Sequence, residues 1–178
     1  TDHVSGVRVL SNKLRIPAWF SAGTFYTLRE TERPALVEIF EPGKSIGIKS
    51  FQVHPFSKNH DAAEPVSFRV EHDGWQVGVF TDIGEACDRV ISHLRQCHAL
   101  FLETNYDEKM LWEGSYPYVL KRRVASSHGH LSNDQAFELL RDHAGPELVQ
   151  VFLSHLSGEN NRPEIAATRF ESLSDRFN

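Results

Sequence analysis

The sequence predicts an α/β sandwich rather than a doubly wound parallel sheet, and two features of the chain indicate this class. Alternating apolar and polar residues in the first half are typical of antiparallel strands, most clearly in residues 66–79, where two such runs flank Asp73-Gly74. From Gly84 onward, helical patterns and short apolar runs take turns. Antiparallel strands followed by helix–strand alternation favour a sheet covered by helices in layers.

The N-terminal part is predicted to open with a helix over residues 4–13, because its apolar residues recur at helical spacing, and Pro17 ends it. The apolar residues 18–20 indicate a short strand. A polar turn then leads into a second helix that ends before Pro34. Residues 35–60 are expected to be mainly strands, since their apolar positions alternate, and the hairpin follows them.

In the C-terminal half, spacings of three to four residues predict the helices and short apolar runs predict the buried strands. The last helix is expected to begin with a capping box formed by Asn161 and Glu164, with Pro163 in its first turn. The predicted elements are helices over residues 86–94, 109–112, 133–143 and 162–176, and strands over residues 99–102 and 149–153.

Length and composition bound the kind of protein. The 178 residues are 40% hydrophobic and 24% charged, which predicts one soluble globular domain over residues 1–178. No apolar stretch reaches the length of a membrane span, no signal peptide opens the chain, and two cysteines without a CxxC pair favour the cytoplasm. The formal charge of -5 gives no general attraction to nucleic acid, so such binding needs a local basic patch.

Residues that could bind a metal follow strands or turns at four places, and the chain has a high count of ten histidines. The pairs Asp2-His3 and His60-Asp61, together with Asp82 and His155, are donors suited to zinc or manganese. A single buried histidine is more often a hydrogen-bonded structural residue, and an Asp after a strand can cap a helix. Only their convergence in the fold would indicate a metal site.

Six segments in order resemble the metallo-β-lactamase-fold hydrolases, most closely the YycJ/WalJ-like branch related to RNase Z and the β-CASP nucleases. They are TDHVSG (the end of the family's HxHxDH motif), PFSKNHDAAEPVSF, FTDIG, LETNYDEKML, YPYVLKRRVASSHGHLSN and FLSHLSGENN, and they cover nearly the whole chain. The resemblance implies an αββα sandwich that lacks its N-terminal portion, since the chain opens inside a motif and without an initiator Met. We therefore expect an upstream segment in the natural protein.

The resemblance also implies a site for two divalent ions, zinc or manganese. Asp2, His3, Asp82 and His155 would bind one ion, and Asp82 would bridge to a second ion that His60 also binds. The remaining two ligands would be the histidines of HxHxDH, which fall before the first residue of this chain. Two ions bridged by a carboxylate lower the pKa of a shared water and stabilise both oxygens of a phosphodiester displacement, which makes Asp82 catalytic as well.

Glu103 and His130 are the expected proton relay, because in RNase Z-like proteins a Glu after a strand pairs with the His of a GHxS motif. His130 would give a proton to the leaving oxygen, and Glu103 would orient its ring and raise its pKa. The alternative is structural. In that interpretation Glu103 caps a helix at Asn105 and His130 caps the helix at Asn133.

Two further sets of residues are predicted around this centre. The basic run of Lys121, Arg122 and Arg123 would bind a nucleic-acid phosphate, although such a run is about as often a solvated helix face. Asp61 and Ser154 would each orient a metal ligand.

The function implied by the resemblance is a metal-dependent phosphodiesterase that hydrolyses nucleic acid, with a DNA exonuclease expected first and RNA processing next. Nucleic acid is therefore the expected partner, without a membrane, and a homodimer is left open. Two alternatives remain. One is a hydrolase of small esters, thioesters or cyclic phosphodiesters, since this fold supports many chemistries. The other is a catalytically inactive binding or scaffold subunit.

Overall fold

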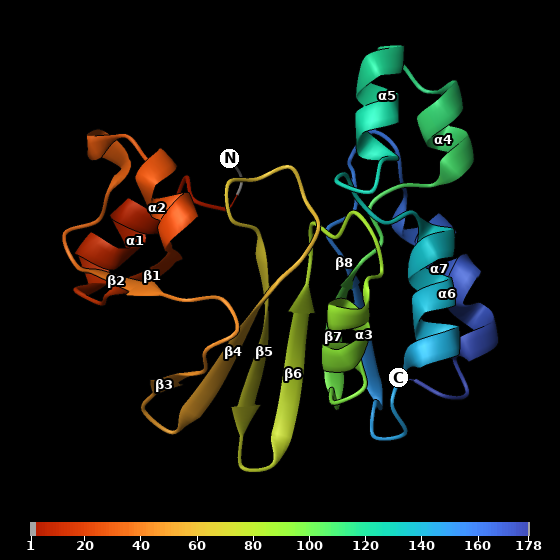
Figure 1. Cartoon of the computed structure of the whole chain (residues 1–178). Coiled ribbons are helices and arrows are strands. Elements are labelled where there is room, and N and C mark those ends of the chain that lie inside the picture. The colour runs from red at the N-terminus through yellow and green to blue at the C-terminus, as the bar shows by residue number, and fades with distance from the viewer. Residues whose placement is uncertain (1–2, 178) are drawn as a thin grey trace.

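The computed structural model describes residues 3–177 (Figure 1). The α-helices are α1 (Val7–Leu14), α2 (Ala22–Thr27), α3 (Asp88–Leu94), α4 (Glu108–Glu113), α5 (Tyr118–Val124), α6 (Asn133–His143) and α7 (Pro163–Phe170). The strands are β1 (Ala18–Ser21), β2 (Val37–Phe40), β3 (Ile46–Ile48), β4 (Phe51–Ser57), β5 (Val66–His72), β6 (Trp75–Phe80), β7 (Ala99–Glu103) and β8 (Gln150–Ser154). Short 3-10 helices lie at Glu30–Glu32 and Glu171–Leu173.

The main sheet has six strands in the order β3-β4-β5-β6-β7-β8. Neighbouring strands are antiparallel as far as β6, whereas β6, β7 and β8 are parallel. The predicted hairpin is confirmed as β5–β6. Its turn places Asp73 at φ 49° and Gly74 at φ 80°, the left-handed pair that a tight two-residue hairpin turn uses.

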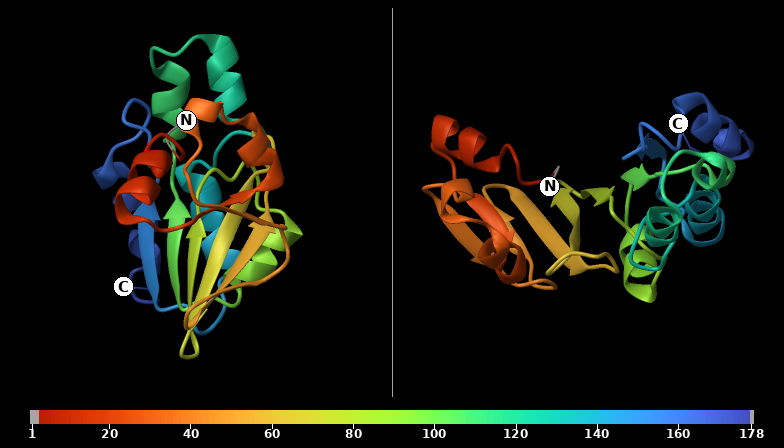
Figure 2. Two further views of the ribbon diagram at one scale, coloured as in Figure 1. Left: turned by 90° about the vertical axis from the view of Figure 1, so that its left-hand side faces the viewer. Right: turned by 90° about the horizontal axis from the view of Figure 1, so that it is seen from above.

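One face of this sheet is covered by α3, α6 and α7, which lie together on one side of it in two views (Figures 1 and 2). The buried core lies between the sheet and these helices, because their apolar side chains meet there. Its fully buried members include Phe80, Leu100 and Leu102 from the strands and Val90, Leu94 and Leu140 from the helices. The predicted α/β class is confirmed by this arrangement.

The opposite face of the sheet is also apolar. Val79, Phe101 and Phe152 lie in register across β6, β7 and β8, and they are 38%, 39% and 44% exposed. The rings of Phe101 and Phe152 stack with 4.7 Å between their centroids. On this side of the sheet, β1 and β2 pair in parallel and form a smaller unit with α1 and α2 (Figure 1).

The element order follows the prediction, with three differences. Helix α5 was not predicted. The helix expected over residues 162–176 ends as an α-helix at Phe170 and continues as a 3-10 turn. The predicted capping box is wrong: Arg162 is the N-cap without a side-chain cap, because the amide of Asn161 is used elsewhere, on Thr104 O and Asn133 Oδ1. No helix in the described part of the chain is long and apolar enough to cross a membrane.

Candidate metal centre

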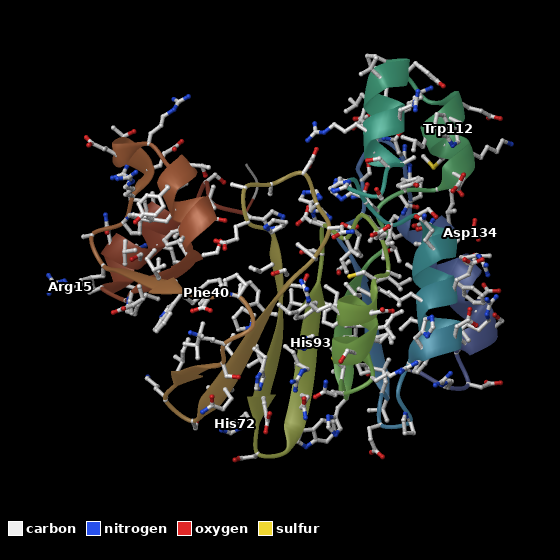
Figure 3. The ribbon with its side chains drawn as sticks, viewed as in Figure 1. Arg15, Phe40, His72, His93, Trp112 and Asp134 are labelled. Atoms are coloured by element: carbon white, nitrogen blue, oxygen red, sulfur yellow. The ribbon has the colours of Figure 1, made fainter. Side chains whose placement is uncertain are left out.

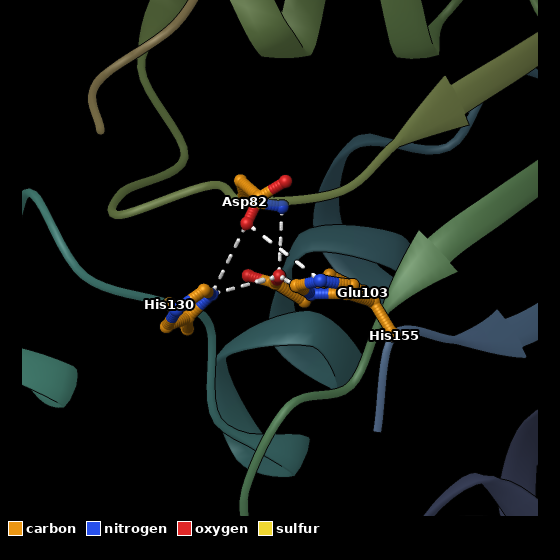
Figure 4. A group of neighbouring side chains, drawn as sticks. All are labelled: Asp82, Glu103, His130 and His155. Carbon is orange, nitrogen blue, oxygen red and sulfur yellow. Dashed lines mark hydrogen bonds and ion pairs between the residues drawn. The ribbon is translucent and has the colours of Figure 1, made fainter. Parts of the chain in front are cut away.

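The candidate site lies where the three parallel strands end. The pairing of β6 with β7 and of β7 with β8 brings the ends of these strands to one edge of the sheet. Asp82 follows β6, Glu103 is the last residue of β7, and His155 directly follows β8. Because the carboxyl ends of parallel strands meet at one edge, these side chains converge there (Figure 4).

Glu103 is fully buried and anchors the strand ends through the backbone. Its carboxylate accepts hydrogen bonds from the N–H groups of Asp82 at 2.7 Å, Ile83 at 3.1 Å and Leu131 at 2.9 Å. The first two bonds fix the turn after β6, and the third fixes the loop before α6. The carboxylate therefore sets the position of the backbone on both sides of the site.

The same carboxylate also orients two histidines. Glu103 Oε2 lies 3.0 Å from His130 Nδ1 and 2.6 Å from His155 Nδ1 (Figure 4). Burial alone would raise the pKa of Glu103, but the hydrogen bonds from these histidines and from the backbone outweigh burial and lower the pKa to about 2. Glu103 is thus an ionised, fully bonded acceptor. The predicted contact of Glu103 with His130 is present, and the contact with His155 was not predicted.

Histidine Nε2 atoms meet at the two oxygens of Asp82. His60 Nε2 lies 3.5 Å and His155 Nε2 3.7 Å from Oδ1, while His3 Nε2 lies 2.5 Å from Oδ2. In His60, Nδ1 bonds to Gly129 O at 3.0 Å, and in His155 it bonds to Glu103. A partner on one ring nitrogen leaves the other nitrogen as the metal ligand, which is the usual arrangement of a ligating histidine.

Two of these residues adopt a backbone conformation that is rare for residues other than glycine. Asp82, two residues after β6, has φ 53°, and His155, directly after β8, has φ 55°. Such conformations persist where surrounding contacts hold them, often at functional sites. Glu103 holds the turn at Asp82, and Asn105 Nδ2 donates to His155 O at 2.9 Å. Asn105 was not identified from the sequence; its only signal there is its place two residues after Glu103.

The described donor set fits a divalent ion. Asp82, Glu103, His130 and His155 each offer a ligand atom, and these atoms lie within 4.8 Å of one another. The oxygens of Glu103 are already engaged in hydrogen bonds, so we assign it as support and not as a ligand. A carboxylate with several imidazoles suits zinc or manganese. Asp2, also predicted as a ligand, lies outside the described residues.

The structural alternatives for Glu103 and His130 are wrong. Helix α4 begins at Glu108, and its cap is Asp107, whose carboxylate accepts from Met110 N. Helix α6 is capped by Ser132 in a capping box with Gln135. Neither Glu103 nor His130 caps a helix. The Glu103 carboxylate instead accepts hydrogen bonds from the backbone of Asp82, Ile83 and Leu131, and His130 Nδ1 bonds to Glu103.

Lys58 is a further charged residue of the site that sequence reasoning missed. Its side chain is 5% exposed, its Nζ donates to Thr81 O, and it lies 3.8 Å from Asp82 Oδ2. Burial lowers the pKa of Lys58, and the negative charges of Asp82 and Glu103 partly oppose this effect. Its place two residues before His60 was the only available signal.

Asp61 contacts a predicted ligand and a predicted phosphate-binding residue. Its Oδ1 lies 3.5 Å from His60 Nε2, and its Oδ2 accepts a hydrogen bond from Arg123 Nε. This bond is the main reason that the pKa of Asp61 is lowered. The Asp61–Arg123 pair links α5 to the loop after β4 and so holds Arg123 beside the centre. The carboxylate of Asp61 already balances part of the charge of Arg123.

The remaining predicted residues are Lys121, Arg122 and Ser154. Lys121 Nζ donates to Trp112 O at 2.7 Å and so joins α5 to the end of α4. Arg122 is exposed on α5. Ser154 Oγ is buried without a hydrogen-bond partner among the described residues, so no contact supports a role in orienting His155.

A cleft of about 1050 Å³ contains the centre. Its floor includes Lys58, His60, Asp82, His130 and His155. One wall is formed by α1 and the strands β1 and β2, and the other by α5 and the segment leading into it. The lining combines these polar groups with many apolar side chains, as in many ligand sites.

Comparison with known proteins assigns the family. Residues 1–155 match the β-lactamase superfamily domain. The chain is 30% identical over 93% of its length to exodeoxyribonuclease YycJ of Bacillus anthracis and 31% identical over 93% to exodeoxyribonuclease WalJ of Streptococcus pneumoniae serotype 2, and it spans 64% of the length of each.

The fold comparison agrees. The metallo-β-lactamase fold protein YhfI of Bacillus subtilis matches with a TM-score of 0.70 and 15% identity, over 96% of this chain and 67% of that one. The convergence of Asp82, His60 and His155 at one sheet edge is thus found in a chain whose sequence and fold both match one family. This protein belongs to the metallo-β-lactamase superfamily.

Proposed function

We propose that this protein is a metal-dependent phosphodiesterase that hydrolyses nucleic acid, with DNA as the first candidate and exonuclease action as the mode. The observation that carries the proposal is the convergence of histidine Nε2 atoms on both oxygens of Asp82, beside the Glu103–His130 pair. The names of the relatives YycJ and WalJ support the choice of DNA. The alternatives are a hydrolase of small esters, thioesters or cyclic phosphodiesters and a catalytically inactive binding or scaffold subunit.

His3, His60, Asp82 and His155 would hold two divalent ions, zinc or manganese, together with Asp2 and with ligands supplied upstream. When bound, such ions supply an activated water and stabilise charge on the phosphodiester. Asp82 is suited to a bridging role because its two oxygens face different histidines. Glu103 keeps His130 and His155 in position through their Nδ1 atoms, so that each presents Nε2 to the cleft.

His130 is placed to return a proton to the leaving oxygen. Protonated His130 would donate from Nε2, and the buried carboxylate of Glu103 would stabilise the charged ring through Nδ1. Lys58, another proton-bearing group of the cleft, donates to Thr81 O, and the rings of His60 and His155 lie 5.2 Å and 5.5 Å from that of His130. Both of those rings are assigned to metal binding. His130 is therefore the residue we assign as the acid.

The test uses the natural protein that contains this chain, with Mn²⁺ or Zn²⁺. We expect bound metal by elemental analysis, degradation of end-labelled linear DNA, and loss of degradation in His155→Ala. His72→Ala is the control, because His72 ends β5 at the far end of the sheet from the site (Figure 3). Turnover of bis(p-nitrophenyl) phosphate without action on DNA or RNA would favour a small-molecule hydrolase. Less than one metal ion per chain would favour an inactive subunit.

A further inference from the structure

Lys58 is a buried cation of the metal centre, and its ammonium group faces the carboxylate that we assign as the bridging ligand. Its side chain is 5% exposed, and Nζ lies 3.8 Å from Asp82 Oδ2. His3 Nε2 approaches that same oxygen to 2.5 Å, whereas His60 and His155 approach Oδ1. Lys58 and His3 therefore share one oxygen of Asp82.

The ammonium group of Lys58 is held in this position by the segments around it. Nζ donates a hydrogen bond to Thr81 O, directly after β6. Gly84 N donates to Asn59 O at 2.8 Å, so the loop after β4 is also joined to the loop after β6 through the backbone. Because the side chain is packed between these segments, the ammonium group has little room to move away from Asp82 when another cation binds there.

The two long cationic side chains in the lining of the cleft differ in how their charge is balanced. Within the described part of the chain these are Lys58 and Arg123. Arg123 donates to the carboxylate of Asp61, which is available to it as a partner. The carboxylate beside Lys58 is that of Asp82, which must also serve a divalent ion. The ammonium group and the ion thus compete for one carboxylate oxygen.

We infer that Lys58 weakens binding of the metal ion that Asp82 Oδ2 and His3 would hold, so that the two ions of the centre bind with unequal affinity. This inference rests on the proposed function and concerns the regulation of that same site. Like charges repel strongly in a buried site, because little water lies between them to screen the charge. The His60 side would keep its ion, while the His3 side would exchange its ion with the surroundings. Activity would then follow the concentration of free metal.

The test measures zinc binding and not activity. The natural protein that contains this chain is stripped of metal and titrated with zinc against chromophoric chelators of graded affinity, and native mass spectrometry counts the ions bound at each step. The wild type should bind two ions in two separate steps. Lys58→Met should tighten the weaker step by a factor on the order of 10 to 100 and the tighter step by a smaller factor, because the repulsion falls with distance.

Three further variants separate the charge of Lys58 from its structural role. Lys58→Gln has no charge but keeps an N–H donor for Thr81 O, and it should behave like Lys58→Met. Lys58→Arg keeps the charge and should bind both ions like the wild type. Lys44→Met is the matched control, because Lys44 is 72% exposed in the loop between β2 and β3. Damage to the fold cannot imitate the expected result, since a damaged site binds metal less tightly.

A double-mutant cycle assigns the weaker step to one side of Asp82. In a His60→Ala background, Lys58→Met should still tighten zinc binding, whereas in a His3→Ala background it should have a smaller effect. Zinc steps that are unchanged or weaker in both neutral variants of Lys58 would overturn the inference, as would two equal steps in the wild type.

A higher KM for DNA in Lys58→Met, with unchanged zinc affinities, would also overturn the inference and identify Lys58 as a contact to the substrate. If the zinc affinities change as expected but neither DNA nor RNA is cleaved, the proposed function fails and the inference about Lys58 stands. Cleavage of DNA by a protein whose zinc steps do not depend on Lys58 has the opposite meaning.

Discussion

Replacing Glu103 by glutamine tests the central feature of the site, because Gln has the shape of Glu but not its charge. The amide offers one acceptor oxygen in place of two. Glu103 accepts five hydrogen bonds, so in Glu103→Gln some of these donors must face an NH₂ group. The variant should lose stability and should also release the rings of His130 and His155 from their positions.

The pKa of Glu103 gives the size of the effect. Its fall from 4.5 to about 2 on folding corresponds to about 3 kcal/mol, at about 1.4 kcal/mol per pKa unit. The folded pKa lies below the unfolded one, so this stabilisation is complete above pH 4.5 and is lost as the pH falls towards 2. At pH 7 we therefore expect Glu103→Gln to lower the free energy of unfolding by about 3 kcal/mol. Metal affinity should fall by about 10- to 100-fold, as for other partners of ligating histidines.

Urea unfolding followed by circular dichroism in EDTA measures the first quantity, and zinc titration against a chromophoric chelator measures the second. Glu147→Gln is the control, since Glu147 is exposed in the loop before β8 and should change stability by less than about 0.5 kcal/mol. The difference between wild type and Glu103→Gln should shrink below pH 4.5. A variant as stable as the control, with unchanged zinc affinity, would refute the assignment of Glu103 as the support of the centre.

Two further predictions concern residues outside the ligand set. Burial lowers the pKa of His93 from 6.5 to about 4, so the unfolded chain takes up a proton at a higher pH than the folded protein, and the free energy of unfolding should fall as the pH drops from 6.5 towards 4. Between pH 7 and pH 5, urea unfolding should show that the wild type loses about 2 kcal/mol of stability relative to His93→Gln. Parallel pH profiles of the two proteins would disprove this. A Cβ at Gly129 would come 2.1 Å from Val124 O, and Gly129 O accepts from His60 Nδ1. Gly129→Ala should therefore cost about 1–3 kcal/mol of stability and weaken metal binding. Gly158→Ala is the control, because a Cβ there meets nothing within 4 Å. Equal melting temperatures and equal zinc affinities for the two variants would contradict this prediction.

The spacing of apolar residues along the sequence was sufficient to predict most of the helices and strands. The hairpin, the boundaries of α6 and the strands near the site follow from the two-residue period of strands and the period of about 3.6 residues of helices, because these periods decide which side chains face the core. Helix α5 was missed because its 7 residues are too few to show a clear helical period. The capping box at Asn161 was misassigned, because that side chain serves contacts with Thr104 and Asn133, far away in the chain.

The same division holds for the site. The sequence by itself indicated that Asp82, Glu103 and His155 each follow or end a strand, and only the resemblance implied that Asp82 and His155 share a metal site. The parallel pairing of β6, β7 and β8, which brings all three residues to one edge, came from the tertiary structure. Only the tertiary structure decided how they act together. The bonds of Glu103 to His130 and His155 span 27 and 52 positions, and those spacings follow no local period. Burial of Lys58 beside Asp82 likewise depends on where the sheet places the ends of β4 and β6, which lie on either side of β5, and no short stretch of sequence contains this.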